Sequence, residues 1–245
     1  MTDRPFSELA RFHQLGEDPV PDVVTRLADE HGPARLVWRN ELGGLTFALG
    51  STAHVKWSPH SAGIDLGRER DALGWLAGHH PVPRVLGSGA DGEARWLLTA
   101  TVAGDHAVGD RWRARRPEAV AAIAAGLRAL HALPVDVVPT DRVAEAWAAR
   151  TPPALGPRPP VEHPVVVHGD ACAPNTLVAD DGSWVGHVDL GDLTVGDRWA
   201  DLAVASLSLD WNYGEGHQGE LFDAYGIAPD AERIRWYRAL WEQES

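Results

Sequence analysis

Residues 165–175 have the sequence Val-Val-Val-His-Gly-Asp-Ala-Cys-Ala-Pro-Asn. The three valines predict a short buried strand, which ends in His-Gly followed by Asp170. Asn175 follows that aspartate by five residues. A strand–turn–strand unit then leads to His-Val-Asp-Leu-Gly at 187–191, which contains Asp189. Short apolar strands therefore precede two carboxylates, and one amide lies between them in the sequence.

These three side chains match the needs of phosphoryl transfer. Protein kinases use the pattern H-R-D-x-x-x-x-N followed by the aspartate of D-F-G. One carboxylate orients the attacking hydroxyl and receives its proton, while an amide oxygen and a second carboxylate hold Mg²⁺ on the nucleotide phosphates. Asp170, Asn175 and Asp189 supply these groups in that order. Singly, Asp170 could cap a helix and Asn175 could be a turn residue, but the combination at this spacing favours phosphotransfer.

The rest of the chain divides into a strand-rich part and a helical part. Strands are expected over 36–38, 45–49, 53–57, 83–86 and 94–99, with a helix over 65–78 among them. Helices are expected over 117–131, 198–209, 217–225 and 230–243, a weaker one within 5–31, and an extended proline-rich connector over 151–164. We predict an α+β chain with an N-terminal lobe at 1–103, a C-terminal lobe at 104–245 and a hinge at about 99–104.

The composition is that of a globular protein, with 44% hydrophobic and 23% charged residues among 245. No apolar run approaches the ~18 residues that a transmembrane helix needs. Residues 1–16 carry charges throughout, which predicts no signal peptide. Cys172 is the single cysteine, so an internal disulfide and a multi-cysteine zinc site are excluded. These features together predict a cytoplasmic protein without a membrane partner.

The formal net charge is −13. Such a surface repels phosphate backbones, so we expect no nucleic acid among the partners. The same charge would attract a polycation toward an acidic site. Taken alone, however, an excess of acidic over basic residues is also an ordinary way to keep a protein soluble.

Other catalytic motifs are absent or fail in context. Residues 87–92 match G-x-G-x-x-G, but the residues that follow read as a strand, whereas a dinucleotide fingerprint must open a helix. This segment is therefore predicted to be a hairpin turn. The sequence contains no G-x-S-x-G, H-E-x-x-H or G-x-x-x-x-G-K-[ST], which leaves serine hydrolases, zincins and P-loop enzymes without support.

The segments 168–175, 188–191 and 196–203 resemble the aminoglycoside 3′-phosphotransferase family, and 225–230, Arg233 and 237–240 add to the similarity. His-Gly-Asp-x-x-x-x-Asn alone marks a wide group of small-molecule kinases. The Asp-Ala-Cys-x-Pro-Asn version and the run Asp-Arg-x-x-Asp-Leu-Ala narrow the group considerably. The resemblance is dense from Val165 to Glu242 and implies a bilobal protein-kinase-like fold that uses ATP and Mg²⁺.

The resemblance also assigns nucleotide-binding residues in the N-terminal lobe. Lys56, the only lysine among 22 basic residues, would touch the α- and β-phosphates, and Glu69 would orient it. A compact ammonium suits a point contact with phosphate, although one lysine could also survive by chance in an arginine-rich sequence. The remaining expected nucleotide contacts lie in the loop at Gly43, Gly44 and Thr46 and in the hinge at Ala100 and Val102.

For the acceptor, the expected contacts are Asp170, Asp192, Asp210 and Glu242, although the last three could equally be ordinary surface carboxylates. Three departures from the family pattern concern this end of the site. A proline-rich connector replaces a longer acidic insert between His131 and His168, Asp192 occupies the place of a common arginine, and the C-terminal acidic pair is reduced to Glu242. His131 and His168 are expected to be structural.

The leading hypothesis is an enzyme that moves the γ-phosphate of ATP to a hydroxyl of an aminoglycoside, first of all the 3′ one, and so confers antibiotic resistance. The chain is expected to act as a monomer or weak dimer. A kinase of another hydroxylated small molecule keeps the same chemistry with a different acceptor. A non-catalytic nucleotide-binding pseudokinase is the alternative of another class, and the presence of Lys56, Asp170, Asn175 and Asp189 argues against it.

Overall fold

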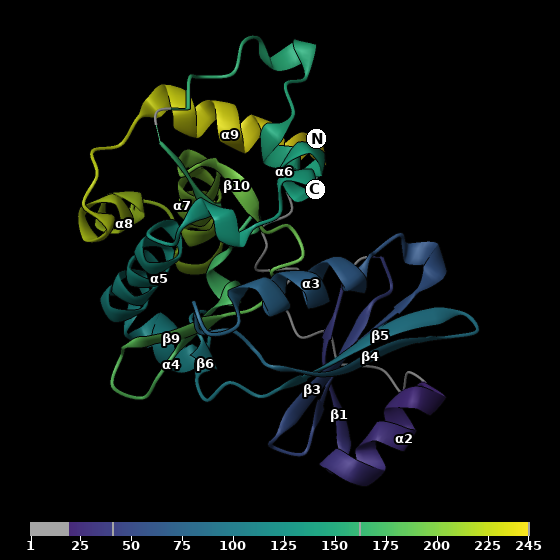
Figure 1. Cartoon of the computed structure of the whole chain (residues 1–245). Helices are drawn as coiled ribbons and strands as arrows, with labels where there is room; N and C mark the ends of the chain where they lie inside the picture. The colour runs from purple at the N-terminus through teal and green to yellow at the C-terminus, as the bar shows by residue number, and fades with distance from the viewer. Residues whose placement is uncertain (1–19, 41, 162, 245) are drawn as a thin grey trace. The chain divides into compact units, whose positions relative to one another are not determined.

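The computed structural model describes residues 20–40, 42–161 and 163–244, coloured along the chain in Figure 1. Two compact units are present. One contains the described residues up to Gly74 together with Pro83–Val102, and the other contains Trp75–Val82 together with the described residues from Ala103 onward. The residues for which we predicted no signal peptide, 1–16, lie outside the described residues, as does the 5–19 part of the expected weak helix.

The first unit is built on a five-stranded antiparallel sheet with the order β1-β2-β3-β5-β4. Its strands are β1 (Ala34–Arg39), β2 (Leu45–Leu49), β3 (Ala53–Pro59), β4 (Val85–Asp91) and β5 (Ala94–Ala100). Helix α2 (Asp22–His31) covers one face of the sheet with Val23 and Val24, which pack on Phe47, Leu49 and Val55. The alternation of side chains along each strand thus gives the sheet an apolar face and leaves the other face for polar groups.

Helix α3 (Leu66–Leu76) follows β3 and carries Glu69 in its first turn. The glycines at 87–92 lie in β4 and in the turn to β5, so this segment is a β-hairpin, as predicted. Four of the five strands coincide closely with the expected ones, because hydrophobic runs with β-branched or aromatic residues mark them. The expected strand 83–86 is wrong in its bounds: β4 runs from Val85 to Asp91, because most of the glycine-containing segment predicted as a turn pairs with β5.

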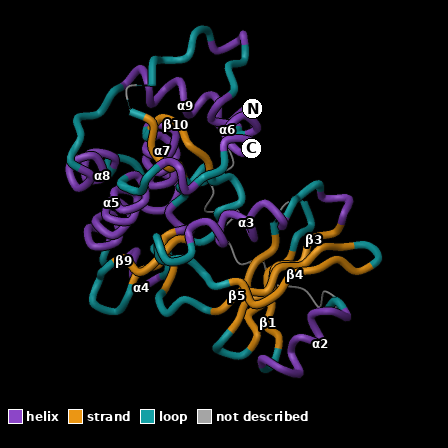
Figure 2. The backbone as a smooth tube through the Cα atoms, in the orientation of Figure 1, coloured by secondary structure: helices purple, strands orange, loops and turns teal. Residues whose placement is uncertain are grey.

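The second unit is mainly helical, as the secondary-structure colours of Figure 2 show. Its main helices are α5 (Arg116–His131), α7 (Trp199–Tyr213), α8 (Gln218–Tyr225) and α9 (Ala231–Glu244). Helix α7 is buried on nearly all sides and packs against α9 and α8, while α5 packs against α8. A helix that is apolar all round is a core helix, so α7 is the element around which this unit is organised.

Two small sheets complete the second unit. Strand β7 (Pro164–Val167) pairs with β10 (Thr194–Asp197), and β8 (Thr176–Val178) pairs with β9 (Trp184–His187) and with β6 (Asp105–His106). The sequence analysis missed β6, β10, α4 (Asp110–Ala114) and α6 (Thr140–Glu145), which are too short for a periodic pattern to develop. The expected extended connector includes one short 3₁₀ turn, Pro153–Leu155.

Within the described part of the chain, no helix has the length and apolar character required to cross a membrane. This agrees with the absence of long apolar runs in the sequence.

Two helical glycines allow the packing of the second unit to be tested against a matched control. A Cβ at Gly126 on α5 would lie 2.7 Å from both His187 Nε2 and Trp184 Nε1, whereas a Cβ at Gly74 on α3 would meet nothing within 4 Å. Gly126→Ala should therefore lower the free energy of unfolding by about 1–3 kcal/mol through overpacking. Gly74→Ala should raise it by up to about 1 kcal/mol, because alanine is the better helix former.

Urea unfolding followed by circular dichroism checks both changes. Equal effects of the two substitutions would contradict the tight packing of α5 against β9.

Candidate active site

The first unit contains a lysine–glutamate pair. Lys56 Nζ on β3 lies 2.7 Å from both carboxylate oxygens of Glu69 on α3. Glu69 is buried, whereas the Lys56 side chain keeps about a quarter of its surface exposed. The pair therefore fixes the position of the ammonium, while part of the lysine side chain stays accessible to solvent. Thr46 lies directly opposite Lys56 on the neighbouring strand β2, so both residues share one face of the sheet.

The loop between β1 and β2 is held together by Asn40. Its Oδ1 accepts hydrogen bonds from Gly44 N at 2.7 Å and from Leu42 N at 3.1 Å, and its backbone oxygen accepts one from Gly43 N at 3.2 Å. The amides that we expected to approach phosphate thus bond within the loop. The hairpin geometry accounts for both glycines, and their nucleotide contact stays a prediction.

The expected hinge begins at the end of β5. The Ala100 amide donates to Arg84 O at 2.8 Å, and the Thr101 amide donates to Thr52 O at 2.9 Å. Both N–H groups therefore already donate to backbone oxygens of the residues that precede β4 and β3. The nucleotide contacts expected at Ala100 and Val102 of the hinge stay a prediction.

In the second unit, a buried carboxylate fixes the turn that follows β7. Asp201 on α7 accepts hydrogen bonds from His168 N at 2.7 Å and Gly169 N at 3.0 Å, and its Oδ2 lies 2.9 Å from His131 Nε2. Two successive backbone N–H groups therefore point at one carboxylate, which determines the direction in which the next residue, Asp170, leaves the strand. The predicted structural roles of His131 and His168 agree with these contacts.

Gly169 is required by its position. Its φ is +86°, and an added Cβ would lie 2.2 Å from the backbone oxygen of Asp192. The left-handed conformation and the close approach both exclude a larger residue. The turn at 168–170, which we call the catalytic turn after the role predicted for Asp170, is therefore in direct contact with the segment after Asp189.

Asp170 and Asn175 are joined by side-chain hydrogen bonds. Asn175 Nδ2 donates to the backbone oxygen of Asp170 and to its Oδ2, each at 2.9 Å. Both amide hydrogens are therefore used, and the Oδ1 lone pairs of Asn175 remain for another partner. Burial raises the pKa of Asp170, the neighbouring Cys172 and His168 act in the opposite direction, and the carboxylates of Asp189 and Asp192 raise it again.

Asp189 has a special backbone. It is the one residue other than glycine, among those described, that has a positive φ, at 60°. The left-handed region is unfavourable for most side chains, and aspartate is among those that tolerate it best. The charge of Asp189 raises the pKa of Asp170, so the two carboxylates interact electrostatically.

The strand that delivers Asp189 is anchored by buried histidines. His187 Nδ1 lies 3.0 Å from His80 Nε2, and the His187 amide donates to Pro81 O at 3.2 Å. Burial lowers the pKa of His80 to about 4 and holds that of His187 well below its usual value. Both imidazoles are therefore neutral at physiological pH and serve as packing groups rather than as cations.

The side-chain oxygen atoms of Asn175 and Asp189 are of the kind that binds Mg²⁺. Hard divalent cations prefer carboxylate and amide oxygens, and Mg²⁺ is commonly bound by one or two carboxylates plus substrate phosphates. Asn175 Oδ1 and the Asp189 carboxylate are such donors. Burial is the main cause of the raised pKa of Asp170, and the carboxylates of Asp189 and Asp192 add to it, a repulsion that a cation would relieve. Across 20–40, 42–161 and 163–244, no three His, Cys, Asp or Glu side chains form a metal site by themselves. A metal here would thus need further oxygen ligands from water or from substrate phosphates.

The three carboxylates expected to contact the acceptor differ in environment. Asp192 and Glu242 are exposed, whereas Asp210 is partly buried and accepts a hydrogen bond from Gln218 Nε2. Asp210 therefore has a structural partner on α8. Their contact with a substrate stays a prediction for all three residues.

Asp201 is the important residue that we did not single out. Its signal was present in the run Asp-Arg-x-x-Asp-Leu-Ala at 197–203, which we had used only as a mark of resemblance. Asp197, in the same run, lies 2.5 Å from Arg233 Nη1 on α9. The two aspartates of this run thus have separate structural roles, one toward the catalytic turn and one toward α9.

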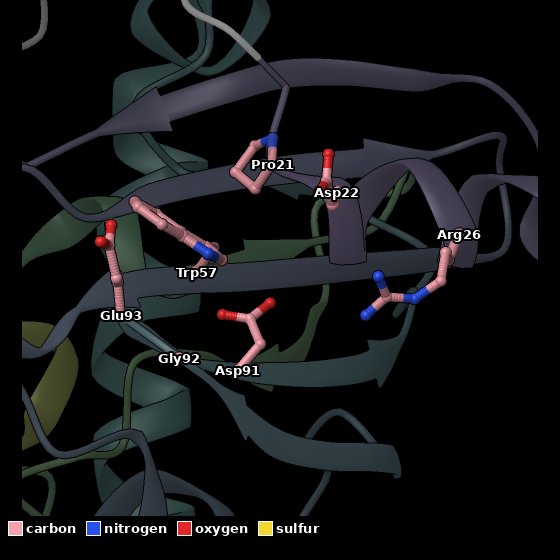
Figure 3. A pocket seen from close by; sticks show the side chains of 7 residues that line it. All are labelled: Pro21, Asp22, Arg26, Trp57, Asp91, Gly92 and Glu93. Atoms are coloured by element: carbon pink, nitrogen blue, oxygen red, sulfur yellow. The ribbon is translucent and has the colours of Figure 1, made fainter.

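A separate pocket of about 330 Å³ lies in the first unit (Figure 3). It is lined by Trp57 of β3, by the start of α2 and by the turn between β4 and β5. Lys56 and Trp57 are neighbours on one strand, so their side chains point to opposite faces of the sheet. The pocket is therefore distinct from the lysine–glutamate pair, and none of the predicted site residues lines it.

Comparison with known proteins agrees with this geometry. A model of the phosphotransferase enzyme family matches residues 45–151 and 139–240. The aminoglycoside 3′-phosphotransferase of Streptomyces fradiae is 35% identical over 221 residues, which cover 76% of this chain and 82% of that protein. The streptomycin 3″-kinase of Streptomyces griseus is 32% identical over 270 residues, with 92% of this chain and 98% of that protein covered.

Solved structures give the same result. An aminoglycoside-3′-phosphotransferase of type VIII matches with a TM-score of 0.73 and 26% identity, covering 91% of this chain and 97% of its own. An aminoglycoside phosphotransferase from Streptomyces rimosus, in complex with ADP and streptomycin, matches with a TM-score of 0.65 and 28% identity over 89% and 96% of the two chains. The expected kinase-like α+β fold is confirmed. The chain belongs to the phosphotransferase enzyme family, among the aminoglycoside phosphotransferases.

Proposed function

We propose that this chain transfers the γ-phosphate of ATP to a hydroxyl group of an aminoglycoside, and so confers resistance to the antibiotic. The observation that carries the proposal is the fixed arrangement of Asp170 and Asn175, with Asp189 in the same electrostatic environment. Family membership supports the donor, since a solved relative contains ADP. We place the activity in the cytoplasm, where ATP is available.

Asp170 is the proposed catalytic residue. Its Oδ2 is engaged by Asn175, so the carboxylate is held in one orientation before substrate arrives. It would accept a hydrogen bond from the acceptor hydroxyl and take up the proton as the oxygen attacks the γ-phosphate. The raised pKa of Asp170 brings its basicity closer to that of the group it deprotonates.

Nucleotide binding is assigned to Lys56, Asn175 and Asp189. Lys56, held by Glu69, would contact the α- and β-phosphates as a point charge. Asn175 and Asp189 would hold Mg²⁺, which neutralises the charge that develops on the transferring phosphoryl group. These assignments follow the order of residues in the family pattern.

The acceptor is proposed to be an aminoglycoside with a free 3′ hydroxyl. A second candidate is the 3″ hydroxyl of streptomycin. The streptomycin 3″-kinase of Streptomyces griseus is similar to this chain over nearly the whole length of both proteins. Both acceptors are polycations, in keeping with the net charge of −13. A kinase of an uncharged hydroxylated metabolite would not require that charge.

The decisive experiment is a coupled assay of ADP release with a panel of acceptors. We expect turnover with kanamycin, little with a 3′-deoxy analogue and none with a neutral polyol, and ³¹P NMR of the product identifies the hydroxyl. Acceptor KM should rise with ionic strength, since screening beyond about 8 Å weakens long-range attraction at physiological salt. Turnover of streptomycin alone would assign the 3″ position, and turnover of only the neutral polyol would refute the aminoglycoside proposal.

Asp170→Asn tests the catalytic assignment. The substitution keeps the shape and removes the charge, so fold and ATP affinity should survive. We expect kcat to fall by about 10²–10⁴-fold, the usual contribution of a positioned general base. Asp223→Asn, at an exposed position on α8, is the matched control and should leave kcat unchanged. A kcat within a few-fold of the parent in a folded Asp170→Asn enzyme would refute the assignment.

Lys56 is tested through nucleotide kinetics. Lys56→Ala should raise the KM for ATP more than that for the acceptor, and Lys56→Arg should be impaired as well, because a planar fork does not replace a compact ammonium. The control is Arg95→Ala, which removes a 3.0 Å ion pair with Asp65 on the exposed surface of the same unit. If Lys56→Arg keeps the parent's ATP kinetics, the lone lysine is an accident of composition.

A further inference from the structure

Arg142 is buried, and none of the roles described so far uses it. It lies on α6 and is only 6% exposed. Its Nε donates to Leu193 O at 3.1 Å, and its Nη2 donates to Gly191 O. The guanidinium carbon also lies 5.7 Å from the ring centroid of Trp75. A buried charge is costly unless its N–H groups find acceptors, and these two carbonyls contribute to that compensation.

The two carbonyls belong to the segment that follows Asp189. This segment, residues 189–193, is part of the connection from β9 to β10 and will be called the metal loop. Gly191 and Leu193 are two residues apart, and a planar guanidinium can donate to both at once because its N–H groups diverge in a fixed fork. Arg142 therefore constrains the metal loop at two points.

The metal loop also meets the catalytic turn. The backbone oxygen of Asp192 approaches Gly169 so closely that a Cβ there would lie 2.2 Å away. The loop is thus confined between Arg142 and the residue that precedes Asp170. A confined loop can keep Asp189 at its φ of 60°, a sparsely populated conformation for residues other than glycine.

We propose that Arg142 is a positioning residue, which holds the metal loop so that Asp189 presents its carboxylate to the nucleotide-bound metal. The inference rests on the proposed function, because only there does Asp189 hold Mg²⁺. Arg142 acts through the backbone of the loop and touches neither nucleotide nor acceptor. Its loss should therefore affect metal binding and loop order rather than acceptor recognition.

The experiment compares Arg142→Gln with Arg128→Gln. Arg128 also donates to a backbone carbonyl, Ala224 O at 3.0 Å, but is exposed and lies on α5. Hydrogen–deuterium exchange of the nucleotide-free protein should show faster exchange of amides 189–193 in Arg142→Gln, with the amides of α7 unchanged. Mn²⁺ binding in the presence of ADP, followed by electron paramagnetic resonance, should weaken by about 10-fold or more, as for other residues that orient metal ligands. Arg128→Gln should change neither.

Two further variants keep the inference testable if Arg142→Gln fails to fold. Arg142→Lys retains the charge but cannot reach both carbonyls in one plane, so its Mn²⁺ affinity should be intermediate. Added guanidinium should restore Mn²⁺ binding to Arg142→Ala, which a purely global loss of stability would not allow. Unchanged loop exchange and Mn²⁺ affinity in folded Arg142→Gln or Arg142→Lys would overturn the inference. Absence of Mn²⁺–ADP binding in the parent enzyme would instead overturn the proposed function.

Discussion

The carboxylate of Asp201 is the interaction on which the active-site geometry of the second unit depends. It accepts hydrogen bonds from two consecutive backbone amides of the catalytic turn and contacts His131 at the end of α5. Each hydrogen bond to a charged group contributes roughly 1.5–3 kcal/mol. Because α7 is the core helix of this unit, the turn that carries Asp170 is tied to its most buried element. The backbone of the turn is thus fixed by Asp201, while the Asp170 carboxylate itself is oriented by its hydrogen bond from Asn175.

The parts of the site that could be predicted from the sequence are those in which side chains perform the chemistry. Asp170, Asn175 and Asp189 need fixed residue types at fixed spacing, so the strand that precedes them and the ribbon between them can be recognised in one sequence. Lys56 and Glu69 were also assigned correctly as a pair, since their ion pair is present at 2.7 Å. Whether these five residues bind nucleotide and metal stays a prediction.

What could not be predicted is the part that depends on backbone groups and long-range contacts. The amides of the loop at Gly43 and Gly44 bond to Asn40, a residue whose role no spacing rule indicates. Arg142 lies on a helix of six residues, too short for a periodic signal, and its partners are carbonyls about fifty residues away. Asp201 was visible only as part of a family pattern, because a side chain that serves two distant amides leaves no local signature.

The residues proposed to contact the acceptor follow a different physical principle from those proposed to contact phosphate. Exposed carboxylates such as Asp192 and Glu242 are solvated, so each affects the rate of encounter and its salt dependence more than the affinity. Asp192 nevertheless differs from Glu242 in one respect. Its backbone oxygen abuts Gly169, and the residues on both sides of it accept hydrogen bonds from Arg142. The same constraints that fix the metal loop therefore hold the main chain of one acceptor-side carboxylate in place, whereas Glu242 projects from the last turn of a terminal helix. An ammonium group that binds Asp192 would meet a carboxylate whose backbone is held in place. A side chain on a fixed backbone loses less conformational entropy on binding than one on a mobile backbone.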